Sequence, residues 1–403
     1  VNDEFVLIDL VGGEPPATPG DGGDEEPAPT SATPPPAAAS IDDAGSLYVF
    51  ARDTEGDLFV FENPGAEWTA DDLSAALGLD GVIGDPITWY DELTERSFAA
   101  ATVDGRLLLF RQTIDGSWSA VDLTTQLPGA ALIERGLTSF TDTQGRTSLA
   151  GLTRSGDLVL YRQTGAMDAF GNAAWEFRNL SAQDLRLNGQ QTPQFVGDLI
   201  AYVTPWNGLH IAGLDSDGDI RAVWWAPRLQ FWQASNLTAI TGSEPLSGGL
   251  TAFLTPWGGV NLAGADAEGD LAVTWWVPGF GGEWRLTNLT DAADGPRLVA
   301  ATTASYVTSW GGLNVAGVDE SGDLVVYWWS PQSNRWRADA LTDGTEGESP
   351  VGAIRGVSRD DSTMHLFARS AEGDVLRFFW SPTAGWASEN VTDAAAEGVV
   401  DPA

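Results

Sequence analysis

The stretch Gly322–Trp329, GDLVVYWW, decides the fold because the chain repeats it. A near copy, GDLAVTWW, occupies residues 269–276, and another, GDIRAVWW, occupies residues 218–225. Each copy combines a tight turn, an apolar run and a pair of tryptophans. Turn residues that bound a short run of β-branched and aromatic residues are typical of strands in hairpins. A strand that recurs in this way indicates a repeat architecture.

The full repeat has three parts and occurs seven times. A turn glycine comes first, a tryptophan follows, and a short segment resembling Asn-Leu-Thr ends the copy. The turn glycines are Gly56, Gly105, Gly156, Gly218, Gly269, Gly322 and Gly373, and the tryptophans are Trp68, Trp118, Trp175, Trp232, Trp284, Trp336 and Trp386. A period near 50 residues with strand-like content is typical of propeller blades. We therefore predict an all-β fold over residues 41–403, a seven-bladed propeller of four-stranded antiparallel blades.

Further regularities support the ring. Residues five positions before the turn glycines are all small: Ala51, Ala100, Gly151, Gly213, Gly264, Gly317 and Ala368. Sheets that stand like spokes crowd one another near the axis, so small residues are expected there. The seven repeat tryptophans occur in every copy, and we expect them in the core. The C-terminal DAAAEGVVDPA matches the start of an inter-blade stretch, so Val399 and Val400 are predicted to lie beside the first blade and close the ring.

The N-terminal residues differ from the repeat. Residues 1–11 contain DEFVLIDLV, which is predicted as an isolated strand, and residues 12–40 form a flexible acidic linker rich in proline. The strand belongs either to a preceding domain or to the open sheet edge of a neighbour. The chain opens at Val1 without a signal-like segment, which we interpret as a piece or processed product of a larger secreted or surface protein.

Composition excludes several classes of partner. The 403 residues include 57 acidic residues, no lysine and no cysteine, and the formal net charge is −37. Such a charge disfavours nucleic acid and anionic membranes, and it favours solubility, cation association or a salty exterior. No apolar run of about 20 residues is present, so no membrane insertion is predicted. The lack of cysteine excludes disulfides and thiolate metal sites.

Two sets of tryptophans occur in copies four to six and not in copies one to three. The turn between the first and second strands carries Trp206, Trp257 and Trp310, and the third strand ends in the pairs Trp224 with Trp225, Trp275 with Trp276, and Trp328 with Trp329. Copies one to three have Glu62, Arg111 and Arg162 at the first position of the pair. A residue required by the fold would appear in every blade, so these tryptophans are optional to the fold.

The optional tryptophans are candidates for a ligand site. The first-to-second and third-to-fourth turns of a blade lie on the same face, so we expect Trp257 near Trp275 and Trp276 of its own blade, with Asn261 pointing into the same region. The equivalent groups are Trp206, Asn207, His210, Trp224 and Trp225, and Trp310, Asn314, Trp328 and Trp329. Indole rings beside amides or an imidazole suit a sugar, whose C–H faces stack while its hydroxyls find polar partners. Packing between blades is the alternative role.

Seven copies with D-x-x-G-D-L, a distal tryptophan and N-L-T resemble bacterial seven-bladed β-propeller lectins and tectonin-like repeat proteins. The resemblance covers residues 41–403 and implies several equivalent saccharide sites, with a glycan or cell-surface component as the partner. The leading hypothesis is a non-catalytic extracellular recognition module that acts through blades four to six. The alternative is a structural subunit of a surface layer or filament, in which Phe5–Leu10 docks on a neighbouring subunit.

The remaining motifs have structural interpretations. DSDGD, DAEGD and DESGD, at residues 215–219, 266–270 and 319–323, suit tight hairpin turns. Calcium is the minor alternative for these turns, and no cofactor is predicted. Four N-x-Ser/Thr sequons begin at Asn179, Asn236, Asn288 and Asn390. His210 and His365 lie in different copies without a nucleophile motif, so we predict no enzyme; a site of unrepeated residues at the axis is the alternative.

Overall fold

The computed structural model describes residues 37–65, 67–79, 84–91, 96–113, 116–167, 173–279, 281–299, 303–358 and 363–396. The chain divides into two units, Val1–Ala32 and Thr33–Ala403, and every described residue belongs to the second unit. The predicted strand at Phe5–Leu10, nearly all of the linker, and Val399 and Val400 lie outside the described residues.

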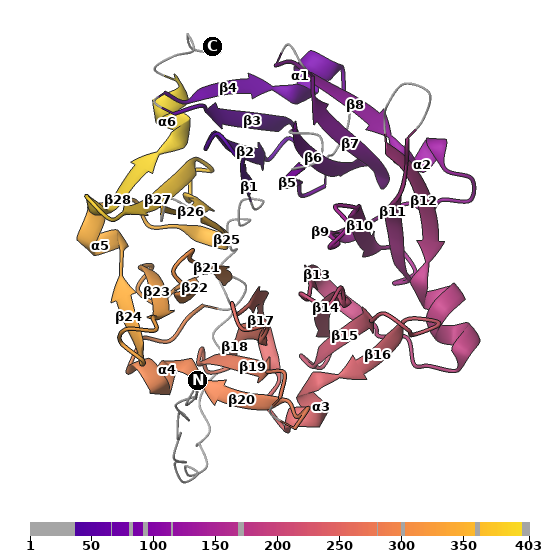
Figure 1. The fold of residues 1–403 in the computed structure, drawn as a ribbon. Helices are drawn as coiled ribbons and strands as arrows, with labels where there is room; N and C mark the ends of the chain where they lie inside the picture. Colours follow the sequence, from indigo (N-terminus) through magenta and orange to yellow (C-terminus); the bar gives the residue numbers. More distant parts are fainter. Residues whose placement is uncertain are drawn as a thin grey trace, which may run out of the picture. The chain divides into compact units, whose positions relative to one another are not determined.

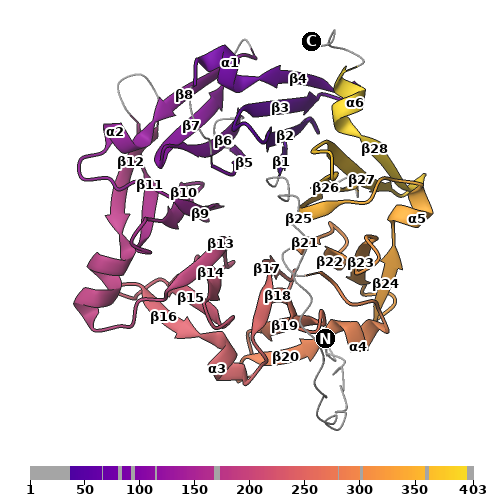
Figure 2. The same ribbon diagram turned by 180° about the vertical axis from the view of Figure 1, so that it is seen from behind.

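Seven four-stranded antiparallel sheets, called blades one to seven in chain order, surround a central axis (Figures 1 and 2). Blades one to three contain β1 (Ala38–Ile41), β2 (Leu47–Arg52), β3 (Leu58–Asn63) and β4 (Thr69–Asp72); β5 (Ile87–Asp91), β6 (Arg96–Val103), β7 (Arg106–Gln112) and β8 (Trp118–Asp122); and β9 (Arg135–Thr141), β10 (Thr147–Leu152), β11 (Leu158–Met167) and β12 (Ala173–Asn179). The predicted seven-bladed propeller is therefore confirmed.

The remaining blades follow the same order. Blades four and five contain β13 (Phe195–Val203), β14 (Leu209–Asp215), β15 (Ile220–Trp225) and β16 (Gln233–Asn236), and β17 (Leu246–Leu254), β18 (Val260–Asp266), β19 (Leu271–Trp276) and β20 (Arg285–Asn288). Blades six and seven contain β21 (Ala304–Val307), β22 (Leu313–Val318), β23 (Leu324–Trp329) and β24 (Trp336–Ala340), and β25 (Val351–Ser358), β26 (Met364–Arg369), β27 (Val375–Ser381) and β28 (Gly385–Asn390). The first strand of each blade lies nearest the axis (Figure 1).

A short helical segment follows the fourth strand of each blade: α1 (Leu73–Leu77), α2 (Leu123–Gln126), η1 (Ser181–Leu185) with η2 (Arg186–Asn188), α3 (Leu237–Thr241), α4 (Leu289–Ala293), α5 (Thr342–Thr345) and α6 (Val391–Ala396). No helix among the described residues has both the length and the apolar character needed to cross a membrane.

The core lies between the blades. In β23, Leu324, Val325, Val326 and Tyr327 are all at most 2% exposed, although successive side chains of a strand point to opposite faces. The apolar cluster around Leu298 joins residues of blades five and six. The third strands are therefore covered on both sides, as their continuous apolar runs predict.

The Asn-Leu-Thr segment at the end of each blade accepts a hydrogen bond from a residue at the start of the third strand, and we call this contact the latch. In blade five, Leu271 N donates to Thr290 Oγ1 at 2.8 Å, and Asn288 Oδ1 caps α4 by accepting from Asp291 N at 3.0 Å. The equivalent hydroxyls in all seven blades accept the same bond: Ser74, Thr124, Ser181, Thr238, Thr290, Thr342 and Thr392. Blade six has Ala340 in place of the asparagine, and α5 lacks a side-chain cap. The hydroxyl is thus the constant part of the latch.

The acidic turns are hydrogen-bonded to the same Asn-Leu-Thr segment. Asp266 Oδ1 accepts from the backbone N atoms of Glu268 and Asp270, at 3.0 and 2.9 Å. Asp270 in turn accepts from Asn288 Nδ2 at 3.3 Å, which ties the turn to the end of the fourth strand. The same Asp-to-backbone bonds occur at Asp215 and Asp319. These contacts account for the acidic turns through hairpin chemistry.

The small residues before the turn glycines are all buried. A Cβ atom at Gly317 would lie 2.6 Å from Leu298 Cδ1, and one at Gly264 would lie 2.8 Å from Leu246 Cδ1. A register shift in β17 follows Leu246 directly. The expected crowding is therefore present, but at these glycines it comes from the incoming segment of the same blade and not from a neighbouring blade, because the irregular start of the first strand carries a leucine over the glycine.

The ring closes through side chains of blades seven and one. Trp68 Nε1 donates to Glu389 Oε1 at 2.9 Å, and Arg369 Nη1 donates to the carbonyl oxygen of Arg52 at 3.1 Å. Phe367 of blade seven shares an apolar cluster with Val49 and Trp68 of blade one. Each described sheet takes all four strands from one continuous stretch of sequence, so this packing holds the two ends of the ring together.

Candidate functional site

Each blade from four to six carries a row of aromatic and polar side chains across its strands. The backbone register places Tyr202, His210, Trp224 and Gln233 opposite one another in blade four. The equivalent rows are Phe253, Asn261, Trp275 and Arg285 in blade five, and Tyr306, Asn314, Trp328 and Arg337 in blade six. The pairing of each second-strand residue with the first tryptophan of the pair agrees with the predicted groups.

The turn tryptophans contact the next blade, and the sequence analysis did not predict this contact. Trp206 packs edge-on against Trp276, with ring centroids 5.6 Å apart. Trp257 meets Trp329 at 5.8 Å, and Trp310 meets Trp380 at 5.5 Å. Trp257 was expected near Trp275 and Trp276 of its own blade, and its ring contact is with Trp329 of the next blade. The candidate sites therefore lie between blades four and five, five and six, and six and seven.

The tryptophans differ in exposure according to their place in the blade. Trp206, Trp257 and Trp310 are 41%, 44% and 39% exposed, so the turn tryptophans reach solvent. Both tryptophans of each third-strand pair are partly buried. The seven repeat tryptophans were all expected in the core, but of these only Trp68, Trp118 and Trp232 are buried. Trp175, Trp284, Trp336 and Trp386 are half-buried, and the last three face the aromatic interfaces.

The first tryptophan of each pair is fixed by polar contacts at its edge. Trp328 Nε1 donates to Asp339 Oδ2 at 2.6 Å, and the guanidinium carbon of Arg337 lies 5.4 Å from the Trp328 ring centre. Trp275 Nε1 donates to Thr287 Oγ1 at 3.0 Å, with Arg285 stacked in the same way. The arginine covers part of the ring and adds a cation–π attraction. These rings are therefore preorganised walls of the interfaces.

The polar residues of the predicted groups take different positions. The His210 ring is stacked on Tyr202 at 4.7 Å, and burial lowers its pKa to about 4, so the imidazole is neutral at pH 7. Asn314 Nδ2 donates to the carbonyl oxygen of Gly312 at 3.3 Å, and its side chain faces the interface of blades six and seven. Asn207 is directed elsewhere, because its Oδ1 accepts from Thr143 N of blade three at 3.2 Å.

A cleft of about 820 Å³ opens between blades six and seven. Its aromatic wall comes from Trp310, Trp328 and Trp329 of blade six and Trp380 and Trp386 of blade seven. Asn314, Arg337 and Asp339 supply polar groups to the same cleft. Sequence reasoning did not include Trp380, Trp386, Arg337 or Asp339 in the site. Their equivalence across the copies could have identified them, had the facing surface of the next blade been considered.

The interface of blades seven and one has a different character. Arg377 donates to Glu389 Oε1 at 2.6 Å and to His365 Nδ1 at 3.1 Å, and Glu389 also accepts from Trp68 Nε1. The guanidinium lies 4.2 Å from the Phe379 ring centre. His365, which is buried, is thus held within a polar network.

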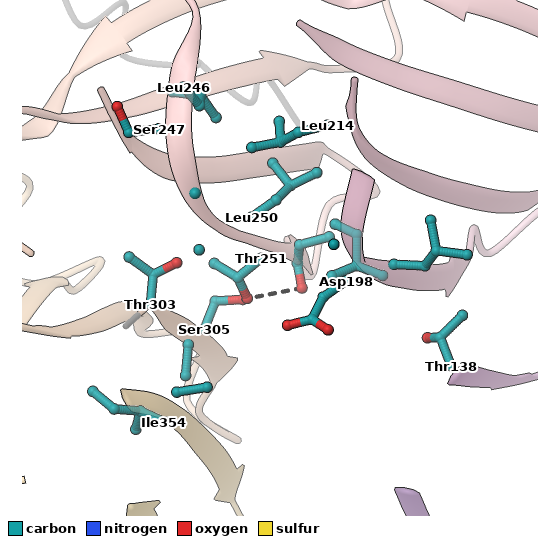
Figure 3. A pocket seen from close by; sticks show the side chains of 18 of the residues that line it. Thr138, Asp198, Leu214, Leu246, Ser247, Leu250, Thr251, Thr303, Ser305 and Ile354 are labelled. Carbon is teal, nitrogen blue, oxygen red and sulfur yellow. Dashed lines mark hydrogen bonds between the residues drawn. The ribbon is translucent and has the colours of Figure 1, made fainter. Parts of the chain in front are cut away.

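A second cavity, of about 990 Å³, follows the axis (Figure 3). The first strands line it with backbone, small side chains and hydroxyl groups, and its charged lining is mainly acidic, with Arg355 beside Asp198, Asp215, Asp217, Glu244 and Glu268. Thr251 and Ser305 share a hydrogen bond of 2.7 Å between blades five and six. Neither histidine lines this cavity.

One group of carboxylates has the proximity that a cation requires. Asp53, Glu55 and Asp57, in the turn between β2 and β3 of blade one, bring their oxygens within 4.8 Å of one another. Asp53 Oδ1 already accepts from three backbone N atoms of its own turn, at 2.8 to 2.9 Å. These bonds are the ones that an acidic hairpin turn makes without an ion.

Comparison with known proteins finds likeness in structure alone. No protein-family model matches the sequence, and no curated protein matches it. The structure is similar to that of the BP39L lectin from Burkholderia pseudomallei, with a TM-score of 0.65 and 16% identity over 88% of this chain and 98% of that one. It is also similar to a triple arginine mutant of AofleA from Arthrobotrys oligospora, with a TM-score of 0.51 and 12% identity over 89% and 86% of the two chains. The resemblance to propeller lectins is thereby confirmed for the fold.

Proposed function

We propose that this chain is a non-catalytic glycan-binding module whose sites are the three aromatic interfaces between blades four and seven. The observation that carries the proposal is the cleft between blades six and seven. There, five tryptophans surround a volume of about 820 Å³, and an amide, a guanidinium and a carboxylate border it. Ligand sites of this kind combine a mostly apolar wall with a few polar groups that fix orientation.

The chemistry of the cleft matches a sugar ring. The half-exposed indole of Trp310 offers a flat surface to the C–H face of a pyranose, and burying that face removes apolar surface from water. Arg337 can donate to sugar hydroxyls, Asp339 can accept from them, and Asn314 can do either. Asp339 already accepts from Trp328 Nε1, and this bond holds the carboxylate in place before a ligand arrives.

Two further observations support recognition over catalysis. The aromatic groups recur at three interfaces, whereas a catalytic pair of carboxylates is needed only once. A similar fold is found in the BP39L lectin, whose name supports carbohydrate binding by analogy of fold. An acidic protein without lysine or cysteine is suited to an extracellular or cell-surface location, and we include that location in the proposal.

A glycan array, followed by tryptophan fluorescence titration, tests the proposal. We expect at least one neutral sugar to bind at millimolar concentration or below and to change the indole emission. Trp310→Ala should weaken binding of that sugar at the cleft of blades six and seven at least tenfold, because it removes the stacking surface, whereas Trp310→Phe should retain most of it. Leu132→Ala, at an exposed site in the segment before blade three, is the control. Absence of binding by every sugar, or equal binding by Trp310→Ala, would remove the proposal.

A further inference from the structure

The three turn tryptophans belong to one continuous surface feature. A Cβ atom at Gly258, beside Trp257, would lie 3.6 Å from Cζ3 of Trp206 in the preceding blade. A Cβ atom at Gly311, beside Trp310, would lie 3.5 Å from Cγ of Pro256. Such distances are ordinary van der Waals separations, so the successive turns pack on one another. We call Trp206, Trp257 and Trp310 with Pro256 the tryptophan ridge.

The ridge is unusual among the exposed apolar residues. Ten large hydrophobic side chains are classed as exposed among the described residues, and the three ridge tryptophans are the only aromatic ones. The others are aliphatic residues or methionine, such as Leu132 in the segment before blade three and Met167 in β11. Scattered apolar residues are normal on a surface, whereas contiguous apolar surface marks a binding site.

We infer that the ridge binds one linear, neutral, β-linked polysaccharide chain across successive blades, so that the clefts act as subsites of one extended site. This inference rests on the proposed glycan-binding function and specifies its ligand class. The contact between the turns carries it, because a ligand that leaves one tryptophan meets the next turn without a gap.

Three features favour a chain of this kind. Packed sheets lie about 10 Å apart, so platforms on successive blades are separated by a distance on the scale of a disaccharide unit. A β-linked chain with equatorial substituents presents flat C–H faces at regular intervals, and each face can cover an indole. The formal net charge of −37 disfavours acidic polysaccharides through long-range repulsion.

The three turn tryptophans also differ in the polar residues that their blades present. The row across blade four, which carries Trp206, contains His210 and Gln233. The row across blade five, with Trp257, contains Asn261 and Arg285, and the row across blade six, with Trp310, contains Asn314 and Arg337. One short sugar would not satisfy all three equally. A chain that spans them gains from each contact after the first without a second loss of translational freedom.

A ladder of cello- and chito-oligosaccharides, from the monosaccharide to the hexasaccharide, tests the inference by isothermal titration calorimetry with the whole chain. We expect the affinity to rise at least 30-fold along one of the two ladders. Trp257→Ala, in the middle of the ridge, should remove most of this gain, so that the affinity for the hexasaccharide falls at least tenfold more than the affinity for the monosaccharide. Trp257→Tyr should restore much of the gain, and Leu187→Ala, an exposed site away from the ridge, should change nothing.

The outcomes separate the two proposals. If monosaccharides bind and the affinity does not rise with length, the clefts are independent sites and the ridge inference is overturned, while the proposed function stands. If heparin or another acidic chain binds more tightly than either neutral ladder, the ligand class is wrong. If no sugar of any length binds, both proposals fall. Circular dichroism of Trp257→Ala, whose indole is half exposed, checks that the blades remain folded.

Discussion

The interface of blades one and two and the cleft of blades six and seven use equivalent positions with opposite results. Glu62 and Trp328 both stand six residues after a turn glycine. Glu62 Oε1 accepts from Trp118 Nε1 of the next blade at 2.8 Å, and Trp118 is buried. Trp328 bonds within its own blade to Asp339, and Trp386 of the next blade stays half-buried at the cleft. In these two blades, a carboxylate at this position accompanies a buried tryptophan in the next blade, and an indole accompanies a half-buried one.

Blade three has an arginine, Arg162, at the same position, six residues after its turn glycine. Arg162 donates to Asp142 Oδ2 at 2.8 Å, and Arg146 donates to the same oxygen at 2.9 Å. The Asp142 side chain is fully buried. Burial alone would raise its pKa, but hydrogen bonds from Arg146 and Arg162 hold the pKa of Asp142 below its usual value. Blades one to three therefore use charged and hydrogen-bonded groups where blades four to six use indoles.

Removing the carboxylate of Asp142 should have the largest effect. Asp142→Ala leaves two guanidiniums without their shared partner and also removes the bonds to the backbone N atoms of Gln144 and Arg146. We expect the free energy of unfolding to fall by about 4 kcal/mol, measured by urea denaturation. Sugar binding at the distant aromatic interfaces should not change at temperatures where the variant is folded. A loss below about 1 kcal/mol would contradict the role assigned to the buried pairs.

The stability of the protein should depend on pH through His210 of blade four. Its folded pKa of about 4 lies below the ordinary value of 6.5, so the unfolded chain takes up a proton first as the pH falls. The contribution to stability is therefore complete above pH 6.5, declines between pH 6.5 and 4, and is lost below pH 4. From the shift, the loss is about 3 kcal/mol.

Other groups also titrate in this range, so a matched variant isolates the histidine. His210→Asn places in blade four the residue type that blades five and six already have as Asn261 and Asn314. The difference in unfolding midpoint between the two proteins should change between pH 7 and pH 4, in favour of the variant at low pH. A difference that is independent of pH would show that His210 is not protonated late in the folded state.

Converting the open cleft to the sealed type should have the smallest of these effects. In Trp328→Glu, the new carboxylate stands where Glu62 stands in blade one and is expected to accept from Trp386 Nε1. Sugar affinity at this cleft should fall about tenfold, or about 1.4 kcal/mol, in a fluorescence titration, with little loss of stability. Trp328→Phe, which has the residue type of Phe379 in blade seven, is the control. Unchanged affinity in Trp328→Glu would break the link between this position and the opening of the cleft.

Most of the fold could be predicted because its signals lie within one repeat. The turn glycine, the apolar third strand and the Asn-Leu-Thr segment are close in sequence, and their contacts are local. The blade number followed from counting copies. In the structure Asn261 pairs with Trp275, because both belong to one sheet. The source of the crowding at Gly264 differed from the expectation, since it depends on an irregular first strand.

The site was harder to predict because its contacts cross from one repeat to the next. A repeat pattern gives the register within a blade but not the direction in which a turn leans. The ring contact of Trp257 with Trp329 was therefore not predicted, and Trp386 was assigned to the core. Asn207 has a backbone φ of 63°, and its side chain turns toward blade three. None of these facts has a signal in a single copy.

The latch at the end of each blade has a consequence for how the protein can be produced. Asn236, Asn288 and Asn390 begin sequons, yet each side-chain nitrogen already donates to an acidic turn residue, and Thr238 and Thr290 have buried hydroxyls. An oligosaccharide attached to such a nitrogen during translation replaces one of its two hydrogens and adds bulk beside the acidic turn, so we expect it to disturb this bond. A host that lacks asparagine-linked glycosylation is therefore the appropriate source of correctly folded material.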